Sequence, residues 1–279
     1  MSEVQDTIKF AKVVGSGNDF IIIDNRGDRL KKSIPNFSRF AKTICERKNS
    51  IGSDGLLVLE DSKTADLKMR IFNPDGSEVT MCGNGARCSA LYAFKNEWCS
   101  ENITMETGAG IIKAQVSSKD VRLAMTNPKD IKLDKDLGLG NTIFKTHFID
   151  TGVPHVVHFL NDDTDIKDYP VKETGKKVRY HKTFEPEGTN ANFVKLNGKS
   201  SIHLRTYERG VEDETLACGT GAVASAIVSH LVYGTEQPVE VITISGDALK
   251  VYFKANGNKV NDVYLEGPAK IVYEGIISI

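Results

Sequence analysis

The sequence contains no apolar run long enough to cross a membrane, because segments such as residues 20–23 fall far short of the ~18 residues that a spanning helix needs. Residues 1–10 lack the basic and then apolar pattern of a secretory signal. Neither charge sign is in excess: 36 basic and 37 acidic residues are mixed along the chain, and the net charge is −1. We therefore expect no membrane partner, no nucleic-acid partner and a cytoplasmic location.

Cysteines are few and odd in number, and no Cys-x-x-Cys spacing occurs among the five. For a chain of 279 residues, five cysteines predict no disulfide framework. We therefore expect the protein in a reducing compartment. Cys82 and Cys88 are wrongly spaced for a zinc hairpin, so we expect no metal site. Cys45, Cys88 and Cys99 are interpreted as small core residues.

The other two cysteines lie in matching surroundings. Cys82 begins the run Cys-Gly-Asn-Gly-Ala and Cys218 the run Cys-Gly-Thr-Gly-Ala, and a small-residue, helix-like stretch follows each. A thiol at a helix N-terminus is close to exposed N–H groups and the positive end of the dipole, which predicts a lowered pKa. A matched pair of thiols suits removal of a proton from one face of a carbon and its return to the other.

Strand-like segments dominate the chain and predict an α+β, barrel-like fold. Helices are predicted at residues 36–47, 86–95 and 222–232, the last two rich in Ala and Ser, as expected for helices buried inside curled sheets. The order of strands, buried helix and strands occurs twice, with a break near residues 126–129, and residues 161–182 are predicted to be the most loop-like. The predicted strands are residues 8–14, 20–24, 56–60, 67–72, 111–116, 121–125, 143–150, 153–160, 191–196, 202–207, 239–244, 249–253, 260–265 and 271–277.

Other motifs leave alternatives open. Residues 219–224 match a GxGxxA dinucleotide pattern with Glu240 downstream, but no convincing strand precedes them. His155 begins an apolar strand and is either structural or the partner of a nucleophilic cysteine, although a cysteine hydrolase leaves the second cysteine run unexplained. Glu208 and Arg209 end a strand shortly before Cys218, so they either face the same cleft or form a surface ion pair.

Taken together, these segments resemble the diaminopimelate epimerase family along the whole chain. The lead-in Phe-Asn-Pro-Asp-Gly-Ser-Glu before the first cysteine run is the most specific part of the match. The segments that carry the resemblance are residues 15–20, 52–55, 70–88, 152–155, 190–193, 207–210 and 217–221.

The resemblance implies a cofactor-free enzyme of lysine and peptidoglycan precursor synthesis that interconverts LL- and meso-diaminopimelate. It implies two pseudo-symmetric domains, each a curled, mostly antiparallel sheet around a central helix: residues 1–127 plus 268–279 carrying Cys82, and residues 128–267 carrying Cys218. The resemblance is also compatible with a homodimer. Cys82 and Cys218 correspond to the catalytic pair, with His155 and Glu208 assisting. The implied substrate-binding residues are Asn18, Asn73, Gly83, Asn84, Asn190, Glu208, Arg209, Gly219 and Thr220.

The chain departs from the family pattern at two places. Val153 stands where the family usually has an asparagine that contacts substrate, and the loop of residues 210–215 is one residue longer than usual. Proline racemases and related enzymes share the two-cysteine arrangement, so racemisation of another amino acid is an alternative. A binding protein for a dicarboxylic amino acid, from a different functional class, needs Arg209 but has no use for two thiols. The planar Arg209 suits the distal carboxylate of diaminopimelate, which proline lacks.

Overall fold

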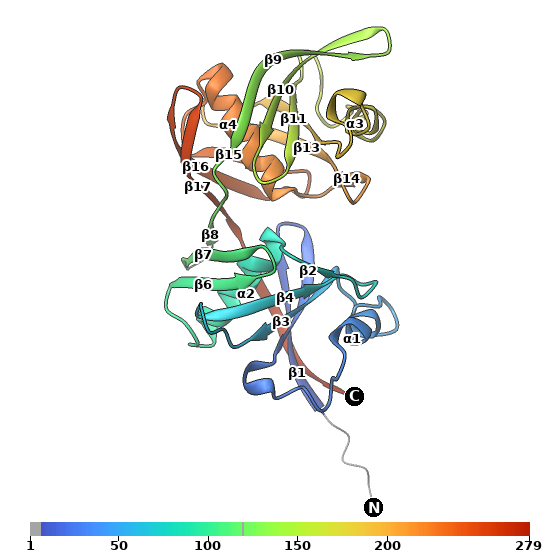
Figure 1. Ribbon diagram of the computed structural model, residues 1–279, viewed down its shortest axis with the longest axis vertical. Coiled ribbons are helices and arrows are strands. Elements are labelled where there is room, and N and C mark those ends of the chain that lie inside the picture. Colours follow the sequence, from blue (N-terminus) through green and yellow to red (C-terminus); the bar gives the residue numbers. More distant parts are fainter. Residues whose placement is uncertain (1–6, 119) are drawn as a thin grey trace, which may run out of the picture. The chain divides into compact units, whose positions relative to one another are not determined.

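The computed structural model describes residues 7–118 and 120–279 and divides into two compact units (Figure 1). Unit 1 comprises the described part of residues 1–123 together with residues 267–279, and unit 2 comprises residues 124–266. The domain limits after residue 127 and before residue 268 stay a prediction, because a compact unit does not define an independently folding domain. None of the helices in the described residues is both long enough and apolar enough to span a bilayer.

Each unit is built mainly of strands. Unit 1 contains β1 (Thr7–Gly15), β2 (Asn18–Asp24), η1 (Arg26–Asp28), α1 (Phe37–Ile44), β3 (Gly55–Glu60), β4 (Leu67–Phe72), β5 (Glu78–Val79), α2 (Gly83–Lys95), β6 (Asn102–Thr107), β7 (Gly110–Val116), β8 (Asp120–Ala124) and β18 (Lys270–Ser278). Unit 2 contains β9 (Lys129–Leu139), β10 (Thr142–Asp150), β11 (Pro154–Phe159), α3 (Val171–Arg179), η2 (Lys182–Phe184), β12 (Asn190–Leu196), β13 (Ser201–Glu208), β14 (Asp213–Thr215), α4 (Gly219–Tyr233), β15 (Val239–Ile242), β16 (Ala248–Asn256) and β17 (Lys259–Pro268). The strands β8 and β17 extend across the limits of the units.

The two units share one pattern of strand pairing. In unit 1, β1 pairs antiparallel with β18 and β2, β2 runs parallel to β3, β3 antiparallel to β4, and β4 parallel to β6. In unit 2, β10 pairs antiparallel with β9 and β11, β11 runs parallel to β12, β12 antiparallel to β13, and β13 parallel to β15. The helices α1 and α3 occupy the same place in this order, each between the two strands of a parallel pair. The predicted architectural repeat is therefore present.

A buried helix lies inside each sheet. Nine residues of α2 and nine of α4 are buried, and the two runs are almost uninterrupted. Strands contact these helices from several sides: β1, β2, β3, β4, β7 and β18 contact α2, and β10, β11, β12, β13, β15 and β16 contact α4 (Figure 1). A helix with little charge and small side chains can be enclosed in this way because it presents no face that needs water. The predicted fold class is thereby confirmed.

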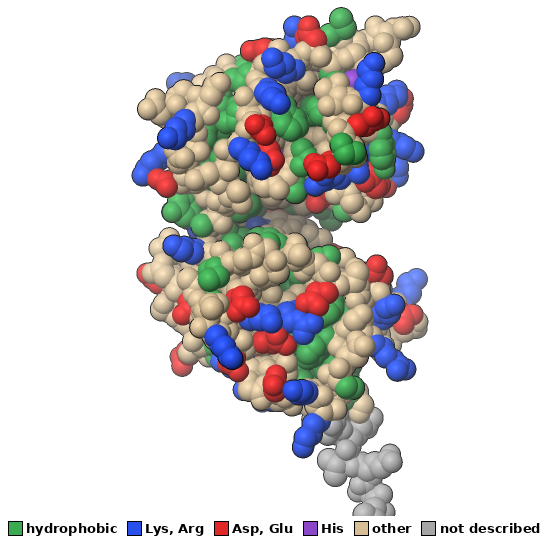
Figure 2. All heavy atoms as spheres, viewed as in Figure 1, with side chains coloured by type: hydrophobic (Ala, Val, Ile, Leu, Met, Phe, Trp, Pro, Cys, Tyr) green, Lys and Arg blue, Asp and Glu red, His purple; other side chains and the backbone are tan. Residues whose placement is uncertain are grey.

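The prediction of a loop over residues 161–182 is wrong, because α3 lies within it. This helix is predominantly polar and buries only Val171, Thr174, Gly175 and Val178, so it has too narrow an apolar stripe for a periodicity argument. Strands β5, β6, β9 and β14 also lie outside the predicted set. Strand β9 carries exposed charged residues along most of its length, and β5 and β14 have only two and three residues. On the face that Figure 2 shows, acidic and basic side chains are interspersed on both units, in keeping with the balanced composition.

Candidate active site

Each cysteine of the matched pair is the N-cap residue of a buried helix. Cys82 has φ −145° and ψ 120° before α2, and Cys218 has φ −114° and ψ 110° before α4, so both are extended and the helix starts at the next residue. Both helices thus begin three residues earlier than predicted. Neither cysteine side chain caps its helix by a hydrogen bond. The N–H groups of residues 83 and 84 and of residues 219 and 220, the first of each helix, have no carbonyl partner within the helix and can bind an anion.

Close packing explains the second glycine of each run. A Cβ on Gly221 would lie 2.5 Å from Asn192 Oδ1 and 3.3 Å from Cys218 Sγ, and a Cβ on Gly85 would lie 3.0 Å from Leu57 Cδ2. Any larger residue would push the first turn of the helix away from the strands beneath it. The glycines therefore set the depth at which each cysteine is held.

In unit 1, three strand ends meet beside the N-terminus of α2. Phe20 at the start of β2 pairs with Gly55 at the start of β3, and Phe72 at the end of β4 pairs with Leu56. The predicted residues Asn18 and Asn73 consequently lie at the same edge of the sheet. The Asn73 side chain donates to Ser77 Oγ (3.0 Å) within the turn that follows β4.

A chain of amides and charges joins this edge to α2. Asn84 Nδ2 donates to Asn18 Oδ1 (2.7 Å), and Asn18 Nδ2 donates to Asp54 Oδ2 (3.1 Å). On the other side, Arg87 Nη2 donates to Asn84 Oδ1 and to Ser16 Oγ, both at 2.7 Å. Arg87 is fully buried, with 0% of its surface exposed. The sequence motif contains Arg87 and Asp54, but only the tertiary contacts reveal that they hold Asn18 and Asn84 in place.

In unit 2, the Cys218 thiol is buried beside Glu208. Thr215 Oγ1 donates to Glu208 Oε2 (2.9 Å), and the Glu208 carboxyl group is also hydrogen-bonded to the Cys218 thiol. Burial raises the pKa of the thiol to about 12, and the neighbouring Glu208 adds to the rise. Burial likewise raises the pKa of Glu208. The prediction of a lowered thiol pKa is therefore wrong for Cys218, because desolvation and the charge of Glu208 outweigh the hydrogen bonds of the sulfur with Thr220 and the backbone of Gly221.

His155 is entirely buried and neutral. Burial, and then the nearby charge of Arg209, lower its pKa from 6.5 to about 3. Asn192 Nδ2 donates to the carbonyl of Val156 (2.9 Å) and lies 3.1 Å from His155 Nδ1, so Nδ1 accepts and the proton is on Nε2. That Nε2 atom is buried and has no hydrogen-bond partner among the described residues. The His155 side chain thus has one donor that no acceptor among the described residues satisfies.

Asn190 and Arg209 are connected to each other. Asn190 Nδ2 donates to the carbonyl of Pro154 (2.9 Å), and Asn190 Oδ1 accepts from the backbone N–H of Arg209 (2.8 Å). Thr151 Oγ1 donates to the carbonyl of Thr220 (3.2 Å), which fixes the first turn of α4. The Asn190 side chain thereby positions the backbone around Arg209.

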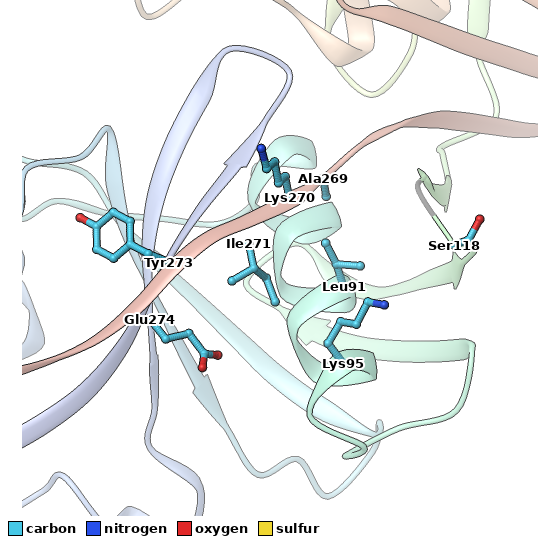
Figure 3. A pocket seen from close by; sticks show the side chains of 8 residues that line it. All are labelled: Leu91, Lys95, Ser118, Ala269, Lys270, Ile271, Tyr273 and Glu274. Atoms are coloured by element: carbon cyan, nitrogen blue, oxygen red, sulfur yellow. The ribbon is translucent and has the colours of Figure 1, made fainter.

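The structure brings the predicted residues of each unit together separately. Unit 1 gathers Asn18, Asn73, Cys82, Gly83 and Asn84, and unit 2 gathers His155, Asn190, Glu208, Arg209, Cys218, Gly219 and Thr220. Within the described ranges, no group of three or more His, Cys, Asp or Glu residues is placed to hold a metal ion. A hollow of about 540 Å³ in unit 1 lies instead between the later turns of α2 and β18, and none of the predicted site residues lines it (Figure 3).

Comparison with known proteins extends the match over both repeats. The diaminopimelate epimerase family matches residues 10–131 and 147–272. A diaminopimelate epimerase from Hydrogenobaculum sp. is 41% identical over an alignment of 280 positions, which covers 96% of this chain and 97% of that protein. Among solved structures, a PhzF-family phenazine biosynthesis protein from Bacillus anthracis has a TM-score of 0.71 at 19% identity, over 98% of this chain and 100% of that one. A hydroxyproline epimerase from Agrobacterium vitis has a TM-score of 0.65 at 14% identity, over 100% of this chain and 94% of that one.

The structural matches support the two-domain α+β fold, and the sequence matches are more specific. The residues matched by the family include both helices that begin after a cysteine and the strand ends that surround these helices. The chain therefore belongs to the diaminopimelate epimerase family.

Proposed function

We propose that this protein is a cofactor-independent isomerase that interconverts LL- and meso-2,6-diaminopimelate in the cytoplasm, for lysine and peptidoglycan precursor synthesis. The observation that carries the proposal is the paired Cys82 and Cys218, each the N-cap of a buried helix at the same point of the repeat. A two-base reaction needs one group on each face of the α-carbon. The 41% identity to a diaminopimelate epimerase favours this substrate.

Proton transfer in this proposal starts with Cys218 as the acid. The raised pKa of about 12 keeps Cys218 protonated, and we assign to Cys82 the removal of the α-proton in one direction of the reaction. The carbanion then takes the proton of Cys218 on the opposite face, which leaves Cys82 as thiol and Cys218 as thiolate. The reverse reaction exchanges these roles. We assign to Glu208, which is hydrogen-bonded to Cys218, the adjustment of the protonation state of this thiol.

The backbone supplies the remaining stabilisation. The substrate α-carboxylate gains negative charge as the α-proton leaves, and preorganised N–H groups stabilise such charge in a dry site. We assign this role to the N–H groups of Gly83 and Asn84 in α2 and of Gly219 and Thr220 in α4. We assign to His155 Nε2 a hydrogen bond to the substrate and to Arg209 the binding of the distal carboxylate, because Nε2 has no partner among the described residues.

Incubation of the enzyme with LL-diaminopimelate in deuterated water tests the proposal. We expect meso product with deuterium at the inverted α-carbon, as resolved by chiral chromatography and mass spectrometry. Binding without deuterium incorporation would instead identify a non-catalytic protein that binds a dicarboxylic amino acid.

A second candidate is racemisation of a different amino acid. Val153 favours it, since this apolar side chain stands where the family usually has asparagine, and the hydroxyproline epimerase shares the fold. The same assay with proline, lysine, histidine and glutamate separates the two candidates. Faster turnover of a monocarboxylate than of diaminopimelate would contradict our proposal.

A further inference from the structure

The turn that carries Glu208 and Arg209 is organised around a single residue, Glu212. Its N–H donates to the carbonyl of Glu208 (2.9 Å), and its own carbonyl accepts from the Tyr207 hydroxyl group (2.8 Å). Its side chain reaches back, so that Oε1 accepts from the N–H of Gly210 (3.0 Å). Glu212 also has φ 60°, a left-handed conformation that a non-glycine residue keeps only when its surroundings hold it there. Glu212 belongs to the loop that is one residue longer than in the family pattern.

Arg179, the last residue of α3, holds Glu212 from the other side. Its Nε and Nη2 atoms both donate to Glu212 Oε1, at 3.1 and 2.9 Å. The Arg179 side chain is only 14% exposed and that of Glu212 35%. A Cβ on Gly188 would lie 1.8 Å from Arg179 Nη1, so the absence of a side chain there makes room for the guanidinium group. Arg179 therefore occupies a fitted position rather than a place on an open surface.

The guanidinium groups of Arg179 and Arg209 share one hydrogen-bond acceptor. Arg179 Nη1 donates to the carbonyl of Glu187 (3.2 Å), and Arg209 Nη1 reaches that carbonyl at 3.4 Å. Two cations thus converge on one oxygen atom, and Glu212 neutralises only Arg179. Burial acts to raise the pKa of Glu212, but the Gly210 N–H, the Tyr180 side chain and Arg179 together lower it below its ordinary value. Within the part of the chain that the structure describes, no carboxylate forms an ion pair with the Arg209 guanidinium group, so its charge is available to an anion.

We propose that Arg179 and Glu212 are a positioning pair, which holds the turn of residues 208–212 so that the Arg209 guanidinium group is presented to the distal carboxylate of the substrate. This inference rests on the proposed function. Glu208 has separate anchors in Thr215 and Cys218, so loss of the pair disturbs substrate binding more than proton transfer. The pair therefore sets KM rather than kcat.

The test uses Glu212→Gln and Arg179→Met, with Asp213→Asn as the matched control. Asp213 lies in the same loop and pairs with Lys172 of the same helix (2.6 Å), but that pair is exposed, at 45% and 72% of the two side chains. We expect each test variant to raise KM for LL-diaminopimelate by about tenfold, as loss of a charged hydrogen bond does, with kcat within about threefold. The double variant should be no worse than about the poorer single variant. Arg179→Lys should raise KM less than Arg179→Met does. The KM of the control variant Asp213→Asn should stay within about twofold of the wild-type value.

Hydrogen exchange of residues 209–212 gives a readout that does not depend on turnover. The backbone N–H groups of Gly210 and Glu212 should exchange faster in both test variants and unchanged in Asp213→Asn. Wild-type enzyme that binds no diaminopimelate would refute the proposed function, and exchange would then decide whether the pair holds the turn. Unchanged KM together with unchanged exchange in Glu212→Gln and Arg179→Met overturns the inference, as does an equal KM rise in Asp213→Asn.

Discussion

At the scale of single residues, the two cysteines differ in their surroundings. Cys218 is 5% exposed, and burial and then Glu208 raise its pKa to about 12, whereas Cys82 is partly exposed. Because the thiolate is the reactive form, we predict that iodoacetamide at about pH 8 labels Cys218 at least about tenfold more slowly than Cys82. Peptide mapping over time measures both rates. Glu208→Gln removes a negative charge and should speed the labelling of Cys218; equal rates for the two cysteines in the wild type would contradict the prediction.

His155 makes stability depend on pH. The folded pKa of about 3 lies below the ordinary value of 6.5, so the unfolded state binds the additional proton between these values. The contribution of neutral His155 to the free energy of unfolding is complete above about pH 6.5. It is lost as the pH falls toward about 3, by up to about 1.4 kcal/mol per pH unit. Urea unfolding of the wild type and His155→Gln from about pH 7 to about pH 4 should show a shallower slope in the variant. His203→Gln, on the partly exposed face of β13, is the control and should keep the wild-type slope.

At the scale of elements, the start of α4 is set by Gly221. A Cβ there would lie 2.5 Å from Asn192 Oδ1, so Gly221→Ala should displace either the helix or the amide that holds His155. We predict a loss of about 1–3 kcal/mol in unfolding free energy and at least about a tenfold loss of kcat/KM. Gly138→Ala, where no atom lies within 4 Å of the added Cβ, should change neither by a comparable amount. Wild-type kinetics in Gly221→Ala would show that the contact is not needed.

The elements also show what the sequence could predict. The cysteine runs and the small residues that follow them were sufficient to predict two buried helices, since such a composition fits few other environments. Helix α3 was not predicted because its apolar stripe is narrow. The repeat itself indicates this helix, because α1 lies between β2 and β3 and the corresponding position in unit 2 is between β11 and β12. Asn192, Glu212 and Arg179 could not be predicted, because their roles depend on contacts between residues far apart in the chain.

At the scale of the whole molecule, each unit contributes one cysteine to the proposed reaction. We predict that Cys82→Ala and Cys218→Ala each lower epimerisation below detection in a chiral assay and leave the fold intact, because each loses only a small side chain. Far-ultraviolet circular dichroism and thermal unfolding serve as the controls for folding. Turnover near that of the wild type in either variant would exclude the two-base mechanism.

The path of the chain between the units has a consequence for biosynthesis. The strand β18 pairs with β1 along Thr7–Ser278 to Val14–Lys270, although the ribosome makes all of unit 2 between these two strands. All residues of unit 2 are therefore made before the last strand of unit 1, and the half that is begun first is finished last. During that interval the unpaired edge of β1 is exposed to other chains. A chain that ends after residue 266 would thus contain every residue of the Cys218 half but lack β18 from the Cys82 half, so the Cys82 half is the one that a chaperone would need to protect.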